Sequence, residues 1–367
     1  MNVEVAFQKR VSRTHKFLKE KKPGTVLWTP QSIIEGNFEL HWISRLMKQD
    51  VCELLDAKLI SEWNDVYLKN LRSQYEKLYA MDYDAVPTPE VYFGIGAVTA
   101  AMSGEPVQFM SDTSWCEPNY SDWDFLEKFS FDPDNVWIRF HTMVLQDMIN
   151  KWEGDYCLLP YLHRSPLDAA NGLRGNDLFM DLYDDPDCAS KLIMKCADWS
   201  IACERHLKEA TNWPKELPRG AWVIALPDDC VFVNGDPVDL VNTQHQAEFD
   251  RPSTGKLFTQ TGGGFFHHHA LGLRQAENVA QTKGLVVQDI LNDPGITPVI
   301  TQMIQNEEIA QKIIHASLKA PVRIWCDFAN NIEEMIPILE QGCFILVDDS
   351  FGKHDICSQK LERFRVS

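Results

Sequence analysis

Three consecutive histidines, His267 to His269, end an apolar run that begins with three glycines. In a β-strand alternate side chains share a face, so His267 and His269 would point together while His268 points away. Two imidazoles on one face form half of a metal site, because zinc takes three or four protein ligands. The alternative is that both histidines are hydrogen-bonded polar residues lining a pocket.

A third metal ligand must come from another part of the chain. Asp348 and Asp349 follow the apolar run 344–347, and Cys343 stands at its start. The carboxyl ends of the strands form the active face of an α/β barrel, so this order favours the aspartates, and Asp349 in particular, over Cys343. A turn or a helix cap explains the two aspartates equally well.

Further aspartates are expected at the ends of other strands. Asp228 and Asp229 follow an apolar run at 221–225, where they are candidates for acid–base catalysis or substrate binding. An Asx-turn or a helix cap is the alternative for this pair. Asp289 and Asp327 lie near the ends of two more predicted strands and are candidate substrate-binding residues. One aspartate at a strand end is weak evidence for a site, but several around one barrel face are stronger evidence, because the loops there converge on one pocket.

Two clusters combine polar and aromatic residues. Trp115 and Glu117 form the first and are predicted to contact the substrate. The second contains Tyr161, His163 and Arg164, with His163 as a candidate catalytic residue. An arginine such as Arg164 can hold a substrate carboxylate through two parallel hydrogen bonds, although an ordinary salt bridge is the more frequent outcome.

Short β-rich runs alternate with longer helical ones from residue 84 onward. Strands are predicted at 25–28, 85–93, 155–162, 221–225, 257–269, 284–290, 321–328 and 343–347. Helices are predicted at 5–22, 39–80, 176–210, 236–248, 273–281, 299–318 and 332–339. This alternation predicts βαβ units and a (β/α)8 TIM barrel, residues 85–367, with residues 1–84 as a helical extension packed on it as part of a single domain. The glycine patterns fit neither a dinucleotide-binding loop nor a P-loop.

The composition limits the classes of partner and compartment. A net charge of −18 and a pI near 5.0 argue against nucleic acid and anionic membrane surfaces as partners. Ten cysteines without regular spacing fit reduced thiols. The charged N-terminal stretch lacks the apolar core of a signal peptide, and no apolar run reaches the roughly 20 residues of a membrane span. We therefore expect a cytoplasmic protein, with a homodimer as the default assembly.

Taken in order, several segments resemble the superfamily of uroporphyrinogen decarboxylases and cobalamin-dependent methyltransferases. The resemblance extends from about residue 80 to the end of the chain, and its specificity lies in the ordered series and not in any single motif. The segments are Val86–Gly94, Trp115–Pro118, Ser165–Asp168, Leu173–Gly175, Asp181–Pro186, Asp228–Cys230 and the strand of His267. The family fold is a (β/α)8 barrel with extra N-terminal helices, which agrees with the pattern above.

The resemblance implies one of two chemistries. The decarboxylases of the family use an arginine-rich N-terminal motif, and Lys9, Arg10 and Arg13 do not form that motif here. The methyltransferases bind zinc through a His-x-Cys pair and a later cysteine. His267 matches the first position, but His269 replaces the first cysteine, and Asp349 stands near the position of the second. This departure shifts the expected ligands toward nitrogen and oxygen donors, which suit zinc or another divalent metal.

The resemblance therefore implies a corrinoid-linked methyltransferase, which moves a methyl group between a small methylated substrate and a corrinoid protein docked over the barrel mouth. Its expected residues are metal ligands His267, His269 and Asp349, catalytic Asp228, Asp229 and His163, and substrate-binding Trp115, Glu117, Arg164, Asp289 and Asp327. The first alternative is a cofactor-free decarboxylase or lyase in which Arg164 or Arg174 holds a carboxylate. The second is a barrel that binds a small ligand without turnover.

Overall fold

The computed structural model describes residues 3–30, 41–111, 113–227, 229–326, 328–348 and 359–365. Within them, seven parallel strands form one sheet in the order β1-β11-β10-β9-β8-β7-β4. The strands are β1 (Thr25–Pro30), β4 (Leu162–Arg164), β7 (Val231–Asn234), β8 (Gly264–His269), β9 (Leu285–Leu291), β10 (Val322–Cys326) and β11 (Cys343–Asp348). Parallel neighbours require crossover connections, and helices supply them here.

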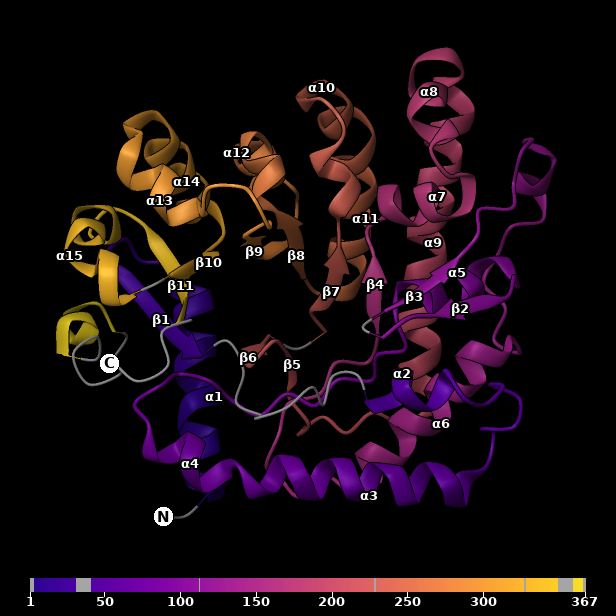
Figure 1. Cartoon of the computed structure of the whole chain (residues 1–367), viewed down its shortest axis with the longest axis horizontal. Helices are drawn as coiled ribbons and strands as arrows, with labels where there is room; N and C mark the ends of the chain where they lie inside the picture. Colours follow the sequence, from indigo (N-terminus) through magenta and orange to yellow (C-terminus); the bar gives the residue numbers. More distant parts are fainter. Residues whose placement is uncertain are drawn as a thin grey trace.

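Helices cover the outer side of this curved sheet, and Figure 1 shows α7 to α15 arranged along it. They are α7 (Pro166–Arg174), α8 (Asp177–Asp184), α9 (Pro186–Ala210), α10 (Thr243–His245), α11 (Arg251–Thr261), α12 (Ala276–Val279), α13 (Val299–Gln305), α14 (Glu307–Lys319) and α15 (Phe328–Leu339). In α9, buried residues recur every three to four positions, which turns one apolar stripe toward the core. The run predicted as a helix at 176–210 is divided at Asp185 into α8 and α9, and Pro186 opens the second helix.

The N-terminal helices are packed on the same core. They are α1 (Val3–Glu20), α2 (His41–Leu46), α3 (Ala57–Ser73) and α4 (Tyr75–Ala80), followed by α5 (Ile95–Ser103) and α6 (Val136–Asn150). Buried residues of α3, α6, β1 and β10 belong to one continuous hydrophobic cluster. Arg10 of α1 also donates hydrogen bonds to the carbonyls of Leu78, Met81 and Ala85. No described helix is long and apolar enough to cross a membrane.

The predicted strand at 85–93 is wrong, and with it the regular eighth strand is missing from the described sheet. Pro87 and Pro89 lack the N–H groups that a ladder needs. The segment instead runs between β1 and the residues before β4: Asp84 N donates to Trp28 O (2.8 Å), and Cys157 N donates to Pro87 O (2.9 Å). The described residues thus form a seven-stranded parallel sheet whose ladder is not closed.

The predicted strand at 221–225 is also wrong, because this stretch folds back on itself. It forms an antiparallel hairpin of β5 (Arg219–Ala221) and β6 (Ile224–Leu226), which lies within the curve of the parallel sheet (Figure 1). Residues of this hairpin pack with Phe17 and Leu18 of α1 and with apolar residues on the inner face of the sheet. The hairpin and α1 therefore fill the lower part of the sheet's interior.

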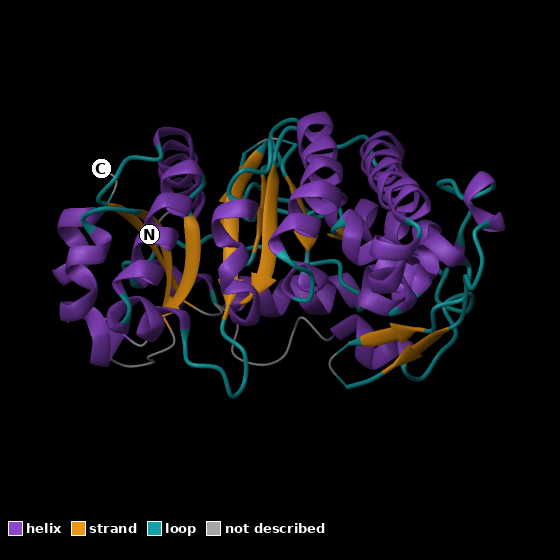
Figure 2. Cartoon of the chain, turned by 90° about the horizontal axis from the view of Figure 1, so that it is seen from above, coloured by secondary structure: helices purple, strands orange, loops and turns teal. Residues whose placement is uncertain are grey.

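Two other predictions require correction. Of the run 257–269, the first five residues end α11, and only Gly264–His269 is strand; Gly262 and Gly263, with φ of 97° and 133°, separate the two elements. Most of the predicted strand at 155–162 precedes β4. A further hairpin, β2 (Val107–Phe109) with β3 (Ser114–Cys116), lies on the side toward which the strand arrowheads point (Figure 2).

Candidate metal site at the carboxyl ends of the strands

A row of polar side chains crosses the inner face of the sheet. Directly paired residues of adjacent parallel strands point to the same face. The register pairs Arg164 with Asn234, Asn234 with His267, His267 with Asp289 and Asp289 with Arg323. Two residues earlier along the strands, the same face is apolar, with Leu162, Phe232, Phe265 and Val287. Buried polar groups need hydrogen-bond partners. This row of polar residues therefore marks where the apolar core of the sheet ends and a candidate site begins.

His267 is held by a buried chain of charged groups. Its Nδ1 lies 2.6 Å from Asp289 Oδ2, and Arg323 Nη1 donates to Asp289 Oδ1 at 2.7 Å. Burial opposes ionisation of Asp289, but Arg323 and His267 outweigh it and keep the pKa of this carboxyl below its ordinary value. An ionised Asp289 accepts the Nδ1 proton of His267. The lone pair of His267 is then on Nε2, the nitrogen that points away from Asp289.

His269, two residues further along β8, also has a carboxylate partner on its Nδ1. Its Nδ1 lies 2.7 Å from Asp293 Oδ1, and its Nε2 lies 3.2 Å from His267 Nε2. His268 points to the other face, where it contacts Asp239 and accepts a hydrogen bond from Gln288. The prediction that His267 and His269 point together is confirmed.

Asp236 completes the cluster from the loop after β7. Its Oδ1 lies 3.4 Å from His269 Nε2 and 3.9 Å from His267 Nε2. Asn234 Nδ2 donates to the other oxygen at 2.9 Å, while Oδ1 is a buried atom without a hydrogen bond of standard geometry. Burial raises the pKa of Asp236, but His269 and His267 lower it by more, so the carboxylate is ionised. Asp236 in turn raises the pKa of His269 to about 9, against the effect of burial.

The three donor atoms that face one another in this cluster are spaced as metal ligands are. Asp236 Oδ1, His267 Nε2 and His269 Nε2 all lie within 4.8 Å of one another, and this is the one such group of three among the described residues. In a tetrahedral zinc site with bonds of about 2.0–2.1 Å, neighbouring ligand atoms lie roughly 3.3 Å apart. The observed separations of 3.2, 3.4 and 3.9 Å fit this requirement. The set is N, N, O, the described residues supply no fourth ligand, and both imidazoles have carboxylate partners on Nδ1, as metal-binding histidines usually do.

Of the other residues predicted for the site, Asp229 and His163 lie elsewhere. Asp229 precedes β7 and pairs with Lys208, so it is at the amino end of the sheet and not at the expected carboxyl end. The cause is the β5–β6 hairpin, which reverses the chain before Asp229. His163 points to the outer face, where Glu204 holds it. Trp115 and Glu117 are exposed on and after β3. Three candidates, Asp228, Asp327 and Asp349, lie outside the described residues.

Two candidate substrate-binding residues are already paired with charged partners. Arg164 donates to Asp168 at 2.7 Å and to Thr99 at 2.6 Å, and it is buried. Asp289 is buried too, and both of its oxygens contact His267 or Arg323. A position inside the sheet explains this outcome, because a buried charge is stable only when paired. Asp289 therefore supports His267 and is not free to contact a substrate.

Sequence reasoning did not identify three residues of the cluster: Asp236, Asp293 and Arg323. Asp236 was expected to open a helix, because the four-residue β7 before it is too short to stand out. Asp293 lies in Asn292–Gly295, a typical turn sequence, and its position after β9 was the available signal. Arg323 was visible as a charged residue inside an otherwise apolar strand, which requires a buried partner.

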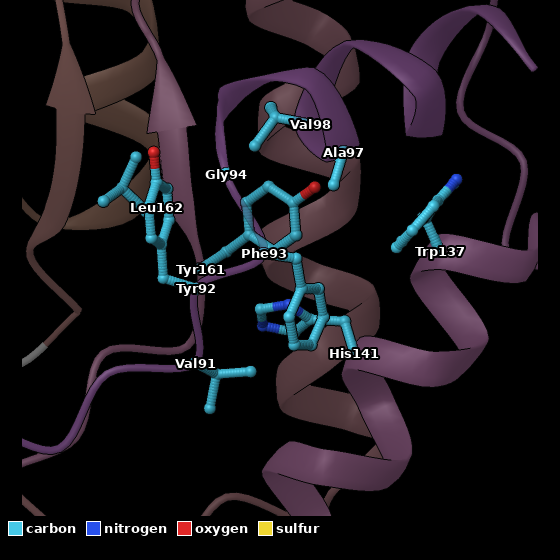
Figure 3. A pocket seen from close by; sticks show the side chains of 10 residues that line it. All are labelled: Val91, Tyr92, Phe93, Gly94, Ala97, Val98, Trp137, His141, Tyr161 and Leu162. Atoms are coloured by element: carbon cyan, nitrogen blue, oxygen red, sulfur yellow. The ribbon is translucent and has the colours of Figure 1, made fainter. Parts of the chain in front are cut away.

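A small pocket between α6, β4 and residues 91–98 lacks the polar donor atoms of the metal cluster (Figure 3). Its volume is about 10 Å³, room for one water molecule, and its lining is mainly apolar and aromatic, including Phe93, Trp137 and Tyr161. The titratable His141 borders it, but its Nε2 is bound to Pro160 O at 2.6 Å. This pocket is a packing defect beside the core and not a competing site.

Comparison with known proteins gives a likeness of fold. No family model and no curated protein matches the chain. Among solved structures, the chain is similar to a methyltransferase from Methanosarcina mazei, with a TM-score of 0.60, 13% identity, and coverage of 97% of this chain and 98% of that one. At this identity the likeness establishes a shared architecture over nearly the full length of both chains.

Proposed function

We propose that this protein is a metal-dependent methyltransferase that moves a methyl group between a small methylated substrate and a corrinoid carried by a partner protein. The observation that carries the proposal is the cluster of Asp236, His267 and His269, whose three donor atoms are spaced as metal ligands are. The full-length likeness to a methyltransferase supports the same class. In this proposal the fold is a (β/α)8 barrel in which residues 84–93 take the place of the eighth strand.

The residues suit zinc or a similar divalent metal. Asp236, His267 and His269 would hold it, and the bound metal would act as a Lewis acid on the heteroatom that carries or receives the methyl group. Asp289 and Asp293 accept the Nδ1 protons of the two imidazoles, and a bound metal would replace the proton that Asp236 holds on His269 Nε2 in the metal-free protein. Arg323 balances the charge of Asp289 inside the sheet.

The charges around the site favour a neutral or cationic substrate. The decarboxylase alternative needs Arg164 or Arg174 to hold a carboxylate, yet Arg164 is bound to Asp168, and Arg174 is bound to Asp181 at 2.7 Å and lies over the ring of Trp123. The exposed side of the cluster presents Asp236 and Asp293 instead. This pattern supports methyl transfer over decarboxylation of a carboxylic acid.

The first experiment measures metal content and its link to activity. Protein without a polyhistidine tag is analysed for bound metals, and methylation of cob(I)alamin is followed by absorbance with panels of methoxylated and methylamine-type compounds. We expect about one metal ion per chain, loss of activity on chelation and recovery on adding zinc. Activity that persists in metal-free protein would overturn the metal role, and carboxylic acid turnover without corrinoid would favour the decarboxylase alternative.

A further inference from the structure

The turn of the β5–β6 hairpin has an unusual backbone for its residues. Trp222 and Val223 have φ of 46° and 61°, so both central residues of this two-residue turn are left-handed. Asn and Gly normally occupy such turns, and a β-branched residue there is strained. Segment 86–90 holds the turn in place: Val223 N donates to Thr88 Oγ1 at 2.8 Å, and Val223 O accepts from Val86 N at 2.9 Å. Strain of this kind persists only where surrounding contacts impose it.

The turn carries the Trp222 ring into the interior of the sheet, beneath the candidate metal site. The ring meets the His267 imidazole edge to face, with centroids 4.7 Å apart and planes at 82°. It also packs against Phe232 at 4.7 Å. The Arg323 guanidinium carbon lies 5.1 Å from the Trp222 ring centroid. One side chain therefore contacts both ends of the chain formed by His267, Asp289 and Arg323.

These contacts restrict the orientation of the His267 ring, which its hydrogen bond to Asp289 alone does not fix. The bond between Nδ1 and Asp289 fixes one point of the His267 ring, but the ring can still tilt about that bond. Packing of Trp222 against the imidazole limits this tilt, and it also keeps Arg323 directed at Asp289. Metal sites depend on ligand orientation, and changes to groups that hold a ligand commonly lower metal affinity about 10–100-fold.

We propose that Trp222 is a positioning residue that sets the plane of the His267 imidazole and so directs Nε2 toward His269 and Asp236. Its consequence for metal affinity rests on the proposed function, whereas its effect on the ring of His267 does not. The strained turn is explained by this role, because it brings one large aromatic ring against both His267 and Arg323.

The test compares Trp222→Leu and Trp222→Phe with wild-type protein in zinc titrations by calorimetry, on tag-free, metal-stripped protein. Leucine lacks an aromatic edge, so we expect its dissociation constant for zinc to rise about 10-fold. Phenylalanine keeps a ring and should remain within about threefold of wild type. The matched control is Trp213→Leu, since Trp213 is also half-buried and lies over an arginine, Arg219, which is paired with Glu204 away from the candidate metal site. The control should leave zinc affinity unchanged.

A second measurement works without metal. Nitrogen-detected NMR of the histidine rings, assigned with His267→Gln, reports the ring environment of His267 in metal-free protein. We expect Trp222→Leu to shift and broaden these resonances, and Trp213→Leu to leave them in place. An unchanged His267 spectrum, or zinc affinity of Trp222→Leu within twofold of a wild type that binds zinc, would overturn the positioning role. If wild-type protein binds no metal but the spectrum shifts, positioning stands and the proposed function fails.

Discussion

Two regions of this molecule contain the same buried chain of histidine, carboxylate and arginine. On the inner face of the sheet, His267 contacts Asp289 at 2.6 Å and Asp289 contacts Arg323 at 2.7 Å. On the outer face, His163 contacts Glu204 of α9 at 3.0 Å, and Glu204 contacts Arg219 at 3.0 Å. Judged by hydrogen bonds and burial alone, both chains resemble the supporting part of a functional site.

The two chains differ at the second ring nitrogen of their histidines. His163 Nδ1 is buried and has no hydrogen-bond partner in the described part of the chain. His267 Nε2 instead faces His269 and Asp236. Adjacent residues of a strand point to opposite faces, so His163 is directed at α9 while its neighbour Arg164 lies on the inner face. A buried ion-pair chain is therefore an indication of structure, and it becomes a site only where a free donor atom meets other donors.

The largest expected effect comes from removing one histidine of each chain. His267→Gln removes a proposed ligand, and zinc affinity should fall by more than the roughly 10–100-fold that supporting residues contribute, with loss of methyl transfer. His163→Gln is the matched variant: we expect zinc affinity within about twofold of wild type and a lower melting temperature. Zinc titration and calorimetric unfolding measure the two quantities. Equal losses of affinity in both variants would contradict the distinction.

The carboxylates of the two chains should differ in the same way. Asp289→Asn changes the partner of His267 Nδ1, and we expect zinc affinity to fall about 10–100-fold. Burial raises the pKa of Glu204, but Arg219 and His163 outweigh it and lower it to about 2. Glu204→Gln breaks this buried group and should cost about 3–5 kcal/mol in the free energy of unfolding without altering zinc affinity. Denaturant unfolding and zinc titration of both variants would show whether these effects separate.

Sequence patterns predicted the part of the site that depends on local periodicity. The alternation along β8 was sufficient to place His267 and His269 together, and the apolar runs of β9, β10 and β11 were recognised as strands. The third donor was not found, since Asp236 reaches the histidines only through the register of β7 with β8. Register depends on pairing between strands that are distant in sequence, which period-two patterns do not report.

The incorrect strand predictions have physical causes of a different kind. Residues 85–93 have an apolar pattern, but two prolines remove ladder donors, and the hairpin turn satisfies the amide of Val86 instead. Residues 221–225 look like one strand until the left-handed pair at Trp222 and Val223 is known. No local rule predicts such a turn without Gly or Asn, because it is imposed by contacts from segment 86–90.

The free energy of unfolding should depend on pH through a buried histidine, His141, that lies near the outer chain. His141, which packs against Tyr161 beside His163, is fully buried, and burial lowers its pKa to about 4. Between pH 6.5 and 4 the unfolded chain binds a proton here that the folded chain does not, so stability falls as pH falls through this window. The full contribution, at most about 3 kcal/mol, is present above pH 6.5. His141→Gln, which keeps a donor for Pro160 O, should flatten the measured slope; an unchanged slope would contradict this assignment.

The smallest effect is expected for Asp229, a residue that sequence reasoning placed at the active face. Its carboxylate is about half exposed, with 52% of its side-chain surface accessible, and it contacts Lys208 at the amino end of β7. Exposed ion pairs contribute roughly 0–1 kcal/mol, so Asp229→Asn should leave unfolding nearly unchanged. Because the chemistry is proposed at the opposite end of the strands, zinc affinity and methyl transfer should match wild type. A large loss of transfer in this variant, with normal folding, would move the reaction to the amino end and remove the basis for separating the two histidine regions.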